Sequence, residues 1–164
     1  MEKILISACL LGQIVRYDAK KIEVDHRLLR QWQQEGRLVP VCPEVEGGLA
    51  VPRPAAEIDG GDGALVLAEY ARVITADGED LTERFLRGAR AALHLARKHQ
   101  IRMAILKENS PSCGSQLIYD GSFSGRKVKG SGVTTTLLEN NRIKVFNEYQ
   151  IEDAAIFLQQ LERK

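Results

Sequence analysis

Short apolar runs alternate with helix-like segments along most of this chain, and this alternation limits the folds that it can adopt. The runs are rich in Ile, Leu and Val without strict polar alternation, as is typical of strands covered on both faces. Strands that alternate with helices predict a mainly parallel sheet with helices on both faces, which is an α/β fold. We expect strands over 3–8, 37–41, 102–107 and 142–147, and helices over 25–36, 79–100, 133–141 and 151–163.

The segments between these elements contain many Gly and Pro residues. Residues 44–62 are expected to form a long loop, and loops of that length are often functional. Residues 64–67 and 71–74 are expected to form a small hairpin or two short edge strands, and residues 119–132 a second loop. Asp25 and Ser131 are expected to cap the helices that follow them.

The charge balance and the cysteine count restrict the class of protein. Lys and Arg number 23 against 22 for Asp and Glu, so the sequence argues against nucleic acid as a partner. No apolar stretch approaches the ~20 residues of a membrane span, and we expect neither a signal peptide nor a membrane partner. The 3 cysteines, an odd number, predict free thiols in a reducing cytoplasm. The 164 residues suit a single domain spanning 1–164, with no prediction of its oligomeric state.

Cys9, Cys42 and Cys113 each lie just past an apolar run, in a turn that contains Gly or Pro. If those runs are neighbouring parallel strands, the three thiols meet at one edge of the sheet, where open α/β folds bind ligands. A lone free cysteine is more often a small core residue, but three in this position indicate a metal centre. Their wide spacing does not match a zinc ribbon, and three soft thiolates fit a [4Fe–4S] cluster with one exposed iron.

Polar residues in the same turns are candidates for the chemistry. Glu44 lies two residues beyond Cys42, where a carboxylate can act as general acid or base, or as a fourth ligand. Ser110 and Ser112 flank a proline before Cys113, and either hydroxyl is placed to bond a substrate or a sulfur. The alternative for both serines is an ordinary role in forming the turn.

Two loops carry side chains suited to binding a planar heterocycle. Arg16 and Tyr17 follow the Cys9 turn, and an arginine and an aromatic ring recognise such a ring by hydrogen bonds or stacking. The alternative is that these charges only fix the loops, in an Arg16–Asp18 pair or an Arg53–Glu57 pair.

These motifs resemble the bacterial thiouracil desulfidase (TudS) family, also known as domain of unknown function 523. The resemblance implies a single Rossmann-like domain in which Cys9, Cys42 and Cys113 hold a [4Fe–4S] cluster. It also implies a non-redox desulfuration with Glu44 and Ser110 at the acid/base and substrate-contacting positions. The matching segments are Ser7-Ala8-Cys9-Leu10-Leu11-Gly12, Arg16-Tyr17-Asp18, Cys42-Pro43-Glu44-Val45, Gly47-Gly48-Leu49, Pro52-Arg53-Pro54, Lys107 to Gly114, Tyr119-Asp120-Gly121 and Phe123.

The chain departs from many members of this family at two positions. Val15 stands where relatives carry a further cysteine, which agrees with a site of three cysteines, and Ala19 stands where glycine is usual.

From the motifs and the resemblance together we expect a hydrolase that converts 2- or 4-thiouracil to uracil and hydrogen sulfide, with the thiocarbonyl sulfur on the open iron. The alternatives are a non-catalytic iron–sulfur or zinc protein that binds a partner or senses redox state, and a desulfidase that acts on thiolated tRNA.

Overall fold

A parallel sheet of four strands forms the centre of the computed structural model, which describes residues 1–22 and 24–163. The strand order is β2-β1-β5-β8, and every neighbouring pair is parallel. The predicted α/β fold and its four principal strands are confirmed. The strands are β1 (Ile4–Ser7), β2 (Leu38–Val41), β5 (Met103–Leu106) and β8 (Lys144–Asn147).

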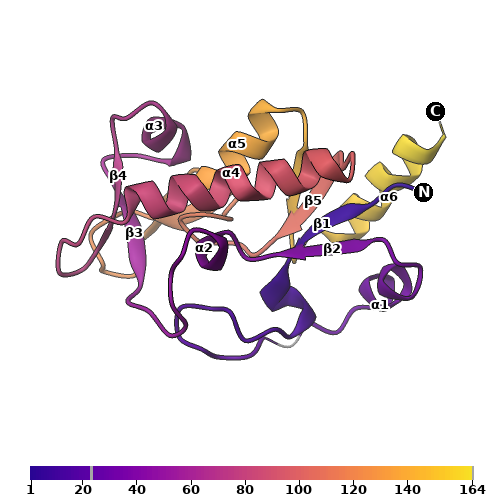
Figure 1. Cartoon of the computed structure of the whole chain (residues 1–164), viewed down its shortest axis with the longest axis horizontal. Helices are drawn as coiled ribbons and strands as arrows, with labels where there is room; N and C mark the ends of the chain where they lie inside the picture. Colours follow the sequence, from indigo (N-terminus) through magenta and orange to yellow (C-terminus); the bar gives the residue numbers. More distant parts are fainter. Residues whose placement is uncertain (23, 164) are drawn as a thin grey trace.

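Helices cover both faces of this sheet (Figure 1). On one face, α1 (Arg27–Gln34) and α6 (Ile151–Glu162) bury side chains such as Trp32 and Leu158 against β1 and β5. On the other face, α4 (Thr82–Lys98) and α5 (Val133–Asn140) lie side by side and bury Ala92 and Leu138. Because both faces are covered, β1 and β5 are completely buried, which explains their continuous apolar sequence.

The strand order places a topological switch point at β1. From β1 the chain passes through α1 to β2 on one side, and it later returns through α4 to β5 on the other side. The loops that leave β1 and β5 therefore diverge to opposite faces and open a crevice at the carboxyl ends of the strands. The segments that contain Cys9, Cys42 and Cys113 all follow strands at this edge.

Two small antiparallel sheets pack beside the main one, and they differ from the sequence predictions. Strand β3 (Ala56–Asp59) pairs with β4 (Arg72–Thr75), and β6 (Leu117–Tyr119) pairs with β7 (Lys127–Lys129). Strand β3 and the short helix α2 (Pro43–Glu46) lie in the segment predicted as one long loop, and the β6–β7 hairpin overlaps the second predicted loop. Residues 64–67 were expected to be extended but belong to helix α3 (Gly63–Leu67).

The two predicted helix caps are also wrong. His26, not Asp25, caps α1, since its Nδ1 accepts the amide of Leu28 at 3.1 Å. Gly132 is the N-cap of α5 and makes no side-chain bond, while the Ser131 hydroxyl lies 3.2 Å from that of Thr136. Within the described residues, no helix has the length and apolar character that crossing a membrane requires.

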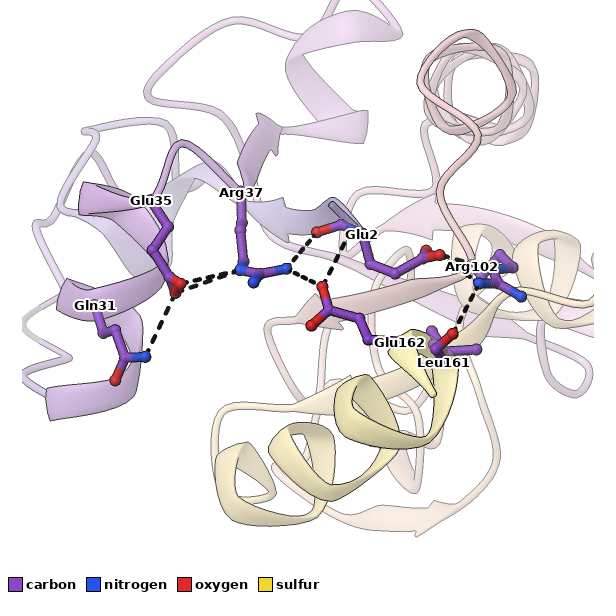
Figure 2. Close-up of polar contacts among 7 residues, drawn as sticks. All are labelled: Glu2, Gln31, Glu35, Arg37, Arg102, Leu161 and Glu162. Carbon is purple, nitrogen blue, oxygen red and sulfur yellow. Dashed lines mark hydrogen bonds and ion pairs between the residues drawn. The ribbon is translucent and has the colours of Figure 1, made fainter. Parts of the chain in front are cut away.

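A polar network ties the first residues to the last helix (Figure 2). Arg37, just before β2, donates a hydrogen bond to the backbone carbonyl of Glu2 at 3.0 Å and pairs with the Glu162 carboxylate in α6. Arg102, just before β5, pairs with the Glu2 side chain. These contacts lie at the amino ends of the strands, whereas the cysteines lie at the carboxyl ends. They therefore stabilise the fold without taking part in the site.

Candidate functional site

All three cysteines line one cavity at the carboxyl ends of the strands. The cavity has a volume of about 270 Å³, and its wall includes Cys9, Cys42 and Cys113. Cys9 lies in a short 3₁₀ helix (Ala8–Leu11) directly after β1, Cys42 is the N-cap of α2, and Cys113 lies in the turn after β5. All three thiols are free. The sheet topology has thus brought together residues that are far apart in the sequence.

The surroundings of the thiols keep them protonated when no cation is bound. Burial, with a smaller contribution from neighbouring Cys42, raises the pKa of Cys9 to about 11. Burial also raises the pKa of Cys113 well above its usual value and, to a smaller extent, that of Cys42. The thiols lie close enough to disfavour each other's ionisation, so three thiolates would need a bound positive charge.

The donor set fits an iron–sulfur cluster. Among the residues that the structure describes, no group of three or more His, Cys, Asp or Glu side chains is arranged to hold a single metal ion. A [4Fe–4S] cluster binds each thiolate through a different iron, so its ligands surround a larger body than one ion. Three free thiols around one cavity, without a fourth cysteine in the chain, match such a cluster with one iron left open.

Glu44 connects two other members of the cavity wall. Its Oε1 accepts a hydrogen bond from Nε of Arg53 at 3.2 Å, and its Oε2 accepts one from the Ser110 hydroxyl at 3.3 Å. The Arg53 side chain is 5% exposed and that of Glu44 is 19% exposed, so the pair is largely shielded from solvent. The Ser110 Oγ also accepts the amides of Ser112 and Cys113, at 3.0 and 3.2 Å. Glu44 and Ser110 are thus held together beside the thiols.

Arg53 joins two loops beside Glu44. Its guanidinium donates to the carbonyls of Ala50 and Val15, each at 3.0 Å, and its backbone amide donates to the carbonyl of Tyr17 at 2.7 Å. The Cys42 thiol also lies 3.8 Å from the Val15 carbonyl. Because these contacts use the backbone of Val15, they do not depend on which side chain stands at this position.

Ser112 does not face the cavity, which corrects the prediction that it contacts a substrate. It is completely buried, and its hydroxyl lies 2.7 Å from that of Thr134 in α5. A hydrogen bond from the Ser112 side chain lowers the pKa of Cys113, against the larger effect of burial. Ser110, not Ser112, is therefore the serine on the cavity wall.

Arg16 and Tyr17 lie on the cavity wall, as expected of residues that meet a ligand there. The predicted Arg16–Asp18 pair is present at 3.6 Å, and the guanidinium of Arg16 lies 5.9 Å from the centre of the Tyr17 ring. The alternative Arg53–Glu57 pair is wrong, because Arg53 pairs with Glu44. Glu57 instead accepts two backbone amides of the β6–β7 hairpin.

Residues just after β5 support the site in ways that the sequence did not reveal. Glu108 is buried, and its Oε1 accepts the amides of Asn109, Ser115 and Gln116, which fixes the loop that contains Cys113. Its Oε2 accepts the side-chain amide of Asn147 at 2.7 Å. Only the position of Glu108, inside a segment that matches the family, could have indicated this role.

Lys107 places an ammonium group on the same wall. Its Nζ lies 2.9 Å from the Glu148 carboxylate, and Glu148 also accepts the amide of Glu108 at 2.8 Å. Its positive charge lowers the pKa of Cys9, although burial has the larger effect and raises it. The edge strand β8, which carries no cysteine, thus contributes to the site through the residues at its end.

Comparison with known proteins agrees with this arrangement. Residues 4–150 match the family described as 2-thiouracil desulfurase. The chain is 44% identical over 150 residues to the uncharacterized protein YbbK of Bacillus subtilis (strain 168), a match that covers 92% of this chain and 98% of that one. It is also similar to the solved structure of the [4Fe-4S]-dependent thiouracil desulfidase TudS, with a TM-score of 0.89 and 46% identity over 98% of this chain and 99% of that chain.

Proposed function

This chain belongs to the 2-thiouracil desulfurase family, and we propose that it is an iron–sulfur-dependent desulfidase that converts a thiolated pyrimidine to its oxygen analogue and hydrogen sulfide. The observation that carries this proposal is a single cavity wall that contains three free thiols together with the hydrogen-bonded Glu44 and Ser110. The expected substrates are 2-thiouracil and 4-thiouracil, and the product is uracil. The reducing cytoplasm is the location that suits three free cysteines.

Cys9, Cys42 and Cys113 are the residues that would hold the [4Fe–4S] cluster. When bound, the cluster supplies a Lewis acid at its one iron without a cysteine ligand, which suits a soft thiocarbonyl sulfur. Lys107, which is held on the cavity wall by Glu148, places a positive charge near the thiolate of Cys9. The chain thus offsets part of the negative charge that three thiolates bring into a buried site.

Glu44 is the group best placed to move protons. Its Oε2 faces Ser110 and is positioned to take a proton from a water molecule that attacks the thiocarbonyl carbon. A carbon–oxygen bond forms and the carbon–sulfur bond breaks, so the reaction needs water but no electron donor or acceptor. Arg53 keeps the other oxygen of Glu44 occupied, and this fixes the direction in which Oε2 points. Ser110 donates a hydrogen bond to Glu44 or to the heterocycle in turn.

Arg16 and Tyr17 are the residues that we assign to substrate binding. They lie on the same cavity wall, and Tyr17 is 42% exposed, so its ring can meet a ligand that enters from solvent. A pyrimidine is planar, and the guanidinium and the ring both offer flat surfaces for stacking. Their contribution is to orient the ring while the other residues act on its thiocarbonyl group.

The first test is sulfide release. The protein is purified without oxygen, reconstituted with iron and sulfide, and incubated with 2- or 4-thiouracil, the corresponding thionucleosides, or thiolated tRNA. We expect hydrogen sulfide from the free bases and none from an unreconstituted control. A stable cluster with no release from any substrate would favour the non-catalytic alternative, and release from tRNA alone would favour the tRNA alternative.

A pair of matched variants separates chemistry from folding. Glu44 and Glu46 lie on the same short helix, but only Glu44 lines the cavity. Glu44→Gln should keep the iron content and absorbance of the cluster and lower kcat by at least about 100-fold, whereas Glu46→Gln should leave both unchanged. Turnover close to wild type in Glu44→Gln would rule out its assigned role. Replacing any of the three cysteines with Ser should remove the bound iron.

A further inference from the structure

Glu57 places a further carboxylate on the wall of the cavity, besides those of Glu44 and Glu108. It lies in β3, outside the main sheet, and is 8% exposed. Carboxylates are almost never buried so deeply unless they are paired. Among the residues that the structure describes, Glu57 has no ion-pair partner, and the proposed desulfuration does not use it.

Only one of the two oxygens of Glu57 is satisfied by the protein. Its Oε1 accepts the amides of Gly121 and Phe123, at 2.9 and 3.2 Å, and thereby holds the β6–β7 hairpin against β3. No donor to its Oε2 is present in the described part of the chain. There, the only fully buried side-chain oxygen or nitrogen without a partner is the hydroxyl of Ser115. The Oε2 of Glu57 therefore remains accessible, and the cavity is the space that Glu57 borders.

The cations of the cavity wall are already committed to other acceptors. Arg16 pairs with Asp18, Arg53 with Glu44, and Lys107 with Glu148. The free oxygen of Glu57 is therefore available to a donor that arrives with the ligand. A carboxylate oxygen is an acceptor only, so the matching group on the ligand is an N–H or O–H.

We propose that Glu57 is a specificity-determining residue whose Oε2 accepts a hydrogen bond from a ring N–H of the heterocycle. This inference rests on the proposed function, because 2- and 4-thiouracil each carry two ring N–H groups, at N1 and N3. The substrate class is then a pyrimidine in which the ring nitrogen that donates to Glu57 carries no substituent other than hydrogen. If that position is N1, nucleosides and RNA are excluded, because their N1 carries the sugar.

Binding of the product tests this assignment without turnover. The reconstituted protein is titrated with uracil, 1-methyluracil and 3-methyluracil, and dissociation constants are measured by calorimetry. A methyl group on the nitrogen that Glu57 reads should weaken binding to wild type by at least about tenfold, because it removes a charge-assisted hydrogen bond and leaves a buried acceptor unpaired. The other methylated compound should lose less.

The variant Glu57→Gln presents an amide group to the cavity in place of the free carboxylate oxygen. Its carbonyl oxygen can still accept Gly121 and Phe123, so the hairpin contact is kept. We expect Glu57→Gln to bind uracil about tenfold more weakly and to lose most of the discrimination against the methylated compound. Asp120→Asn is the matched control, since Asp120 accepts two hydrogen bonds from Ser122 in the same hairpin and does not line the cavity.

The outcomes are separable from those of the proposed function. If uracil and both methylated compounds bind wild type within about twofold, or if Glu57→Gln and Asp120→Asn change binding equally, Glu57 does not read a ring N–H. Failure of wild type to bind uracil would overturn the assignment as well. Binding that depends on Glu57, without any sulfide release from thiouracil, would support the recognition role and contradict the proposed desulfidase activity.

Discussion

Gly88 in α4 packs directly against the carbonyl oxygen of Pro43 in α2, so that a Cβ atom added to Gly88 would lie 1.9 Å from that oxygen. Gly47, at the other end of α2, approaches the backbone of α4 in the same way: an added Cβ would lie 2.1 Å from the Arg84 carbonyl oxygen. The longest helix therefore supports the short helix that carries Glu44 and has Cys42 as its N-cap. The contact is between backbones, and no flexible side chain can move aside.

Gly88→Ala should therefore displace α2 and weaken the site. We expect a loss of about 1–3 kcal/mol in the free energy of unfolding, as for other overpacked positions, together with reduced iron content after reconstitution. Denaturant unfolding and iron analysis measure the two effects. Arg90→Ala is the control on the exposed face of α4, where only a distant pair with Glu83 at 4.0 Å is lost. Wild-type stability and iron content in Gly88→Ala would contradict the supporting role of this contact.

Arg53 positions Glu44, and its loss should affect turnover more than substrate affinity. Arg53→Met removes the bond to Glu44 and those to Val15 and Ala50. We expect kcat to fall by about 10- to 100-fold with a small change in KM. Arg53→Lys should restore part of kcat, because lysine can reach Glu44 but cannot bond both carbonyls at once. Equal changes in kcat and KM, without any rescue by lysine, would indicate a general loss of structure.

Ala19 adopts a left-handed conformation with φ of 56°, which favours glycine over residues with a side chain. The strain of this conformation in alanine, about 1–2 kcal/mol, exceeds the entropy of about 0.5–1 kcal/mol that glycine loses on folding. Ala19→Gly should therefore raise the free energy of unfolding by roughly 0.5–1 kcal/mol. Ala76→Gly, at an exposed turn residue without positive φ, should lower it or leave it unchanged. Thermal unfolding of the two variants makes the comparison.

The Arg37–Glu162 contact should make the free energy of unfolding depend on pH in the acidic range. Hydrogen bonding to Arg37 lowers the pKa of Glu162 in the folded protein. A carboxyl whose pKa is lowered on folding contributes stability above its unfolded pKa and loses it as the pH falls. Glu162→Gln should cost up to about 1 kcal/mol at neutral pH, the usual worth of such a partly exposed pair, and progressively less as the pH falls through the pKa of Glu162 in the folded protein.

Chemical denaturation of wild type and Glu162→Gln at several pH values measures this difference. Glu139→Gln is the control, since Glu139 is exposed and the described residues give it no ion pair. A difference between wild type and Glu162→Gln that grows as the pH falls would contradict the expected acid dependence.

The main sheet could be predicted from the sequence because its strands are apolar on both faces and end at clear turns. Cys9, Cys42 and Cys113 could be assigned to one edge for the same reason, since parallel strands place their carboxyl ends together. Helix α3 could not be predicted, because a run such as Ala64–Leu67 is too short for its periodicity to distinguish a helix from a strand. Asp62, which accepts the amide of Leu65 at 3.2 Å, was the available signal of a helix start.

The ion-pair partners of the charged residues could not be predicted from the sequence. Arg53 could be paired with Glu57 or with Glu44, and both are close to it in the chain. The choice depends on where β3 places Glu57, and β3 was itself hidden in a segment rich in Gly and Pro. Likewise, the two serines of the Cys113 turn are equivalent in sequence, and only the packing of α5 against this turn separates buried Ser112 from Ser110 on the cavity wall.

Strand β8 lies at the edge of the sheet, and Asn147 and Glu148 at its end hold the Cys113 loop through Glu108. The ribosome makes a chain from its N-terminus, so all three cysteines are synthesised before this support exists. The loop that contains Cys113 therefore gains this support only after residue 148 has been synthesised. A cluster held by all three cysteines would therefore find its complete site only once the last strand of the sheet has paired.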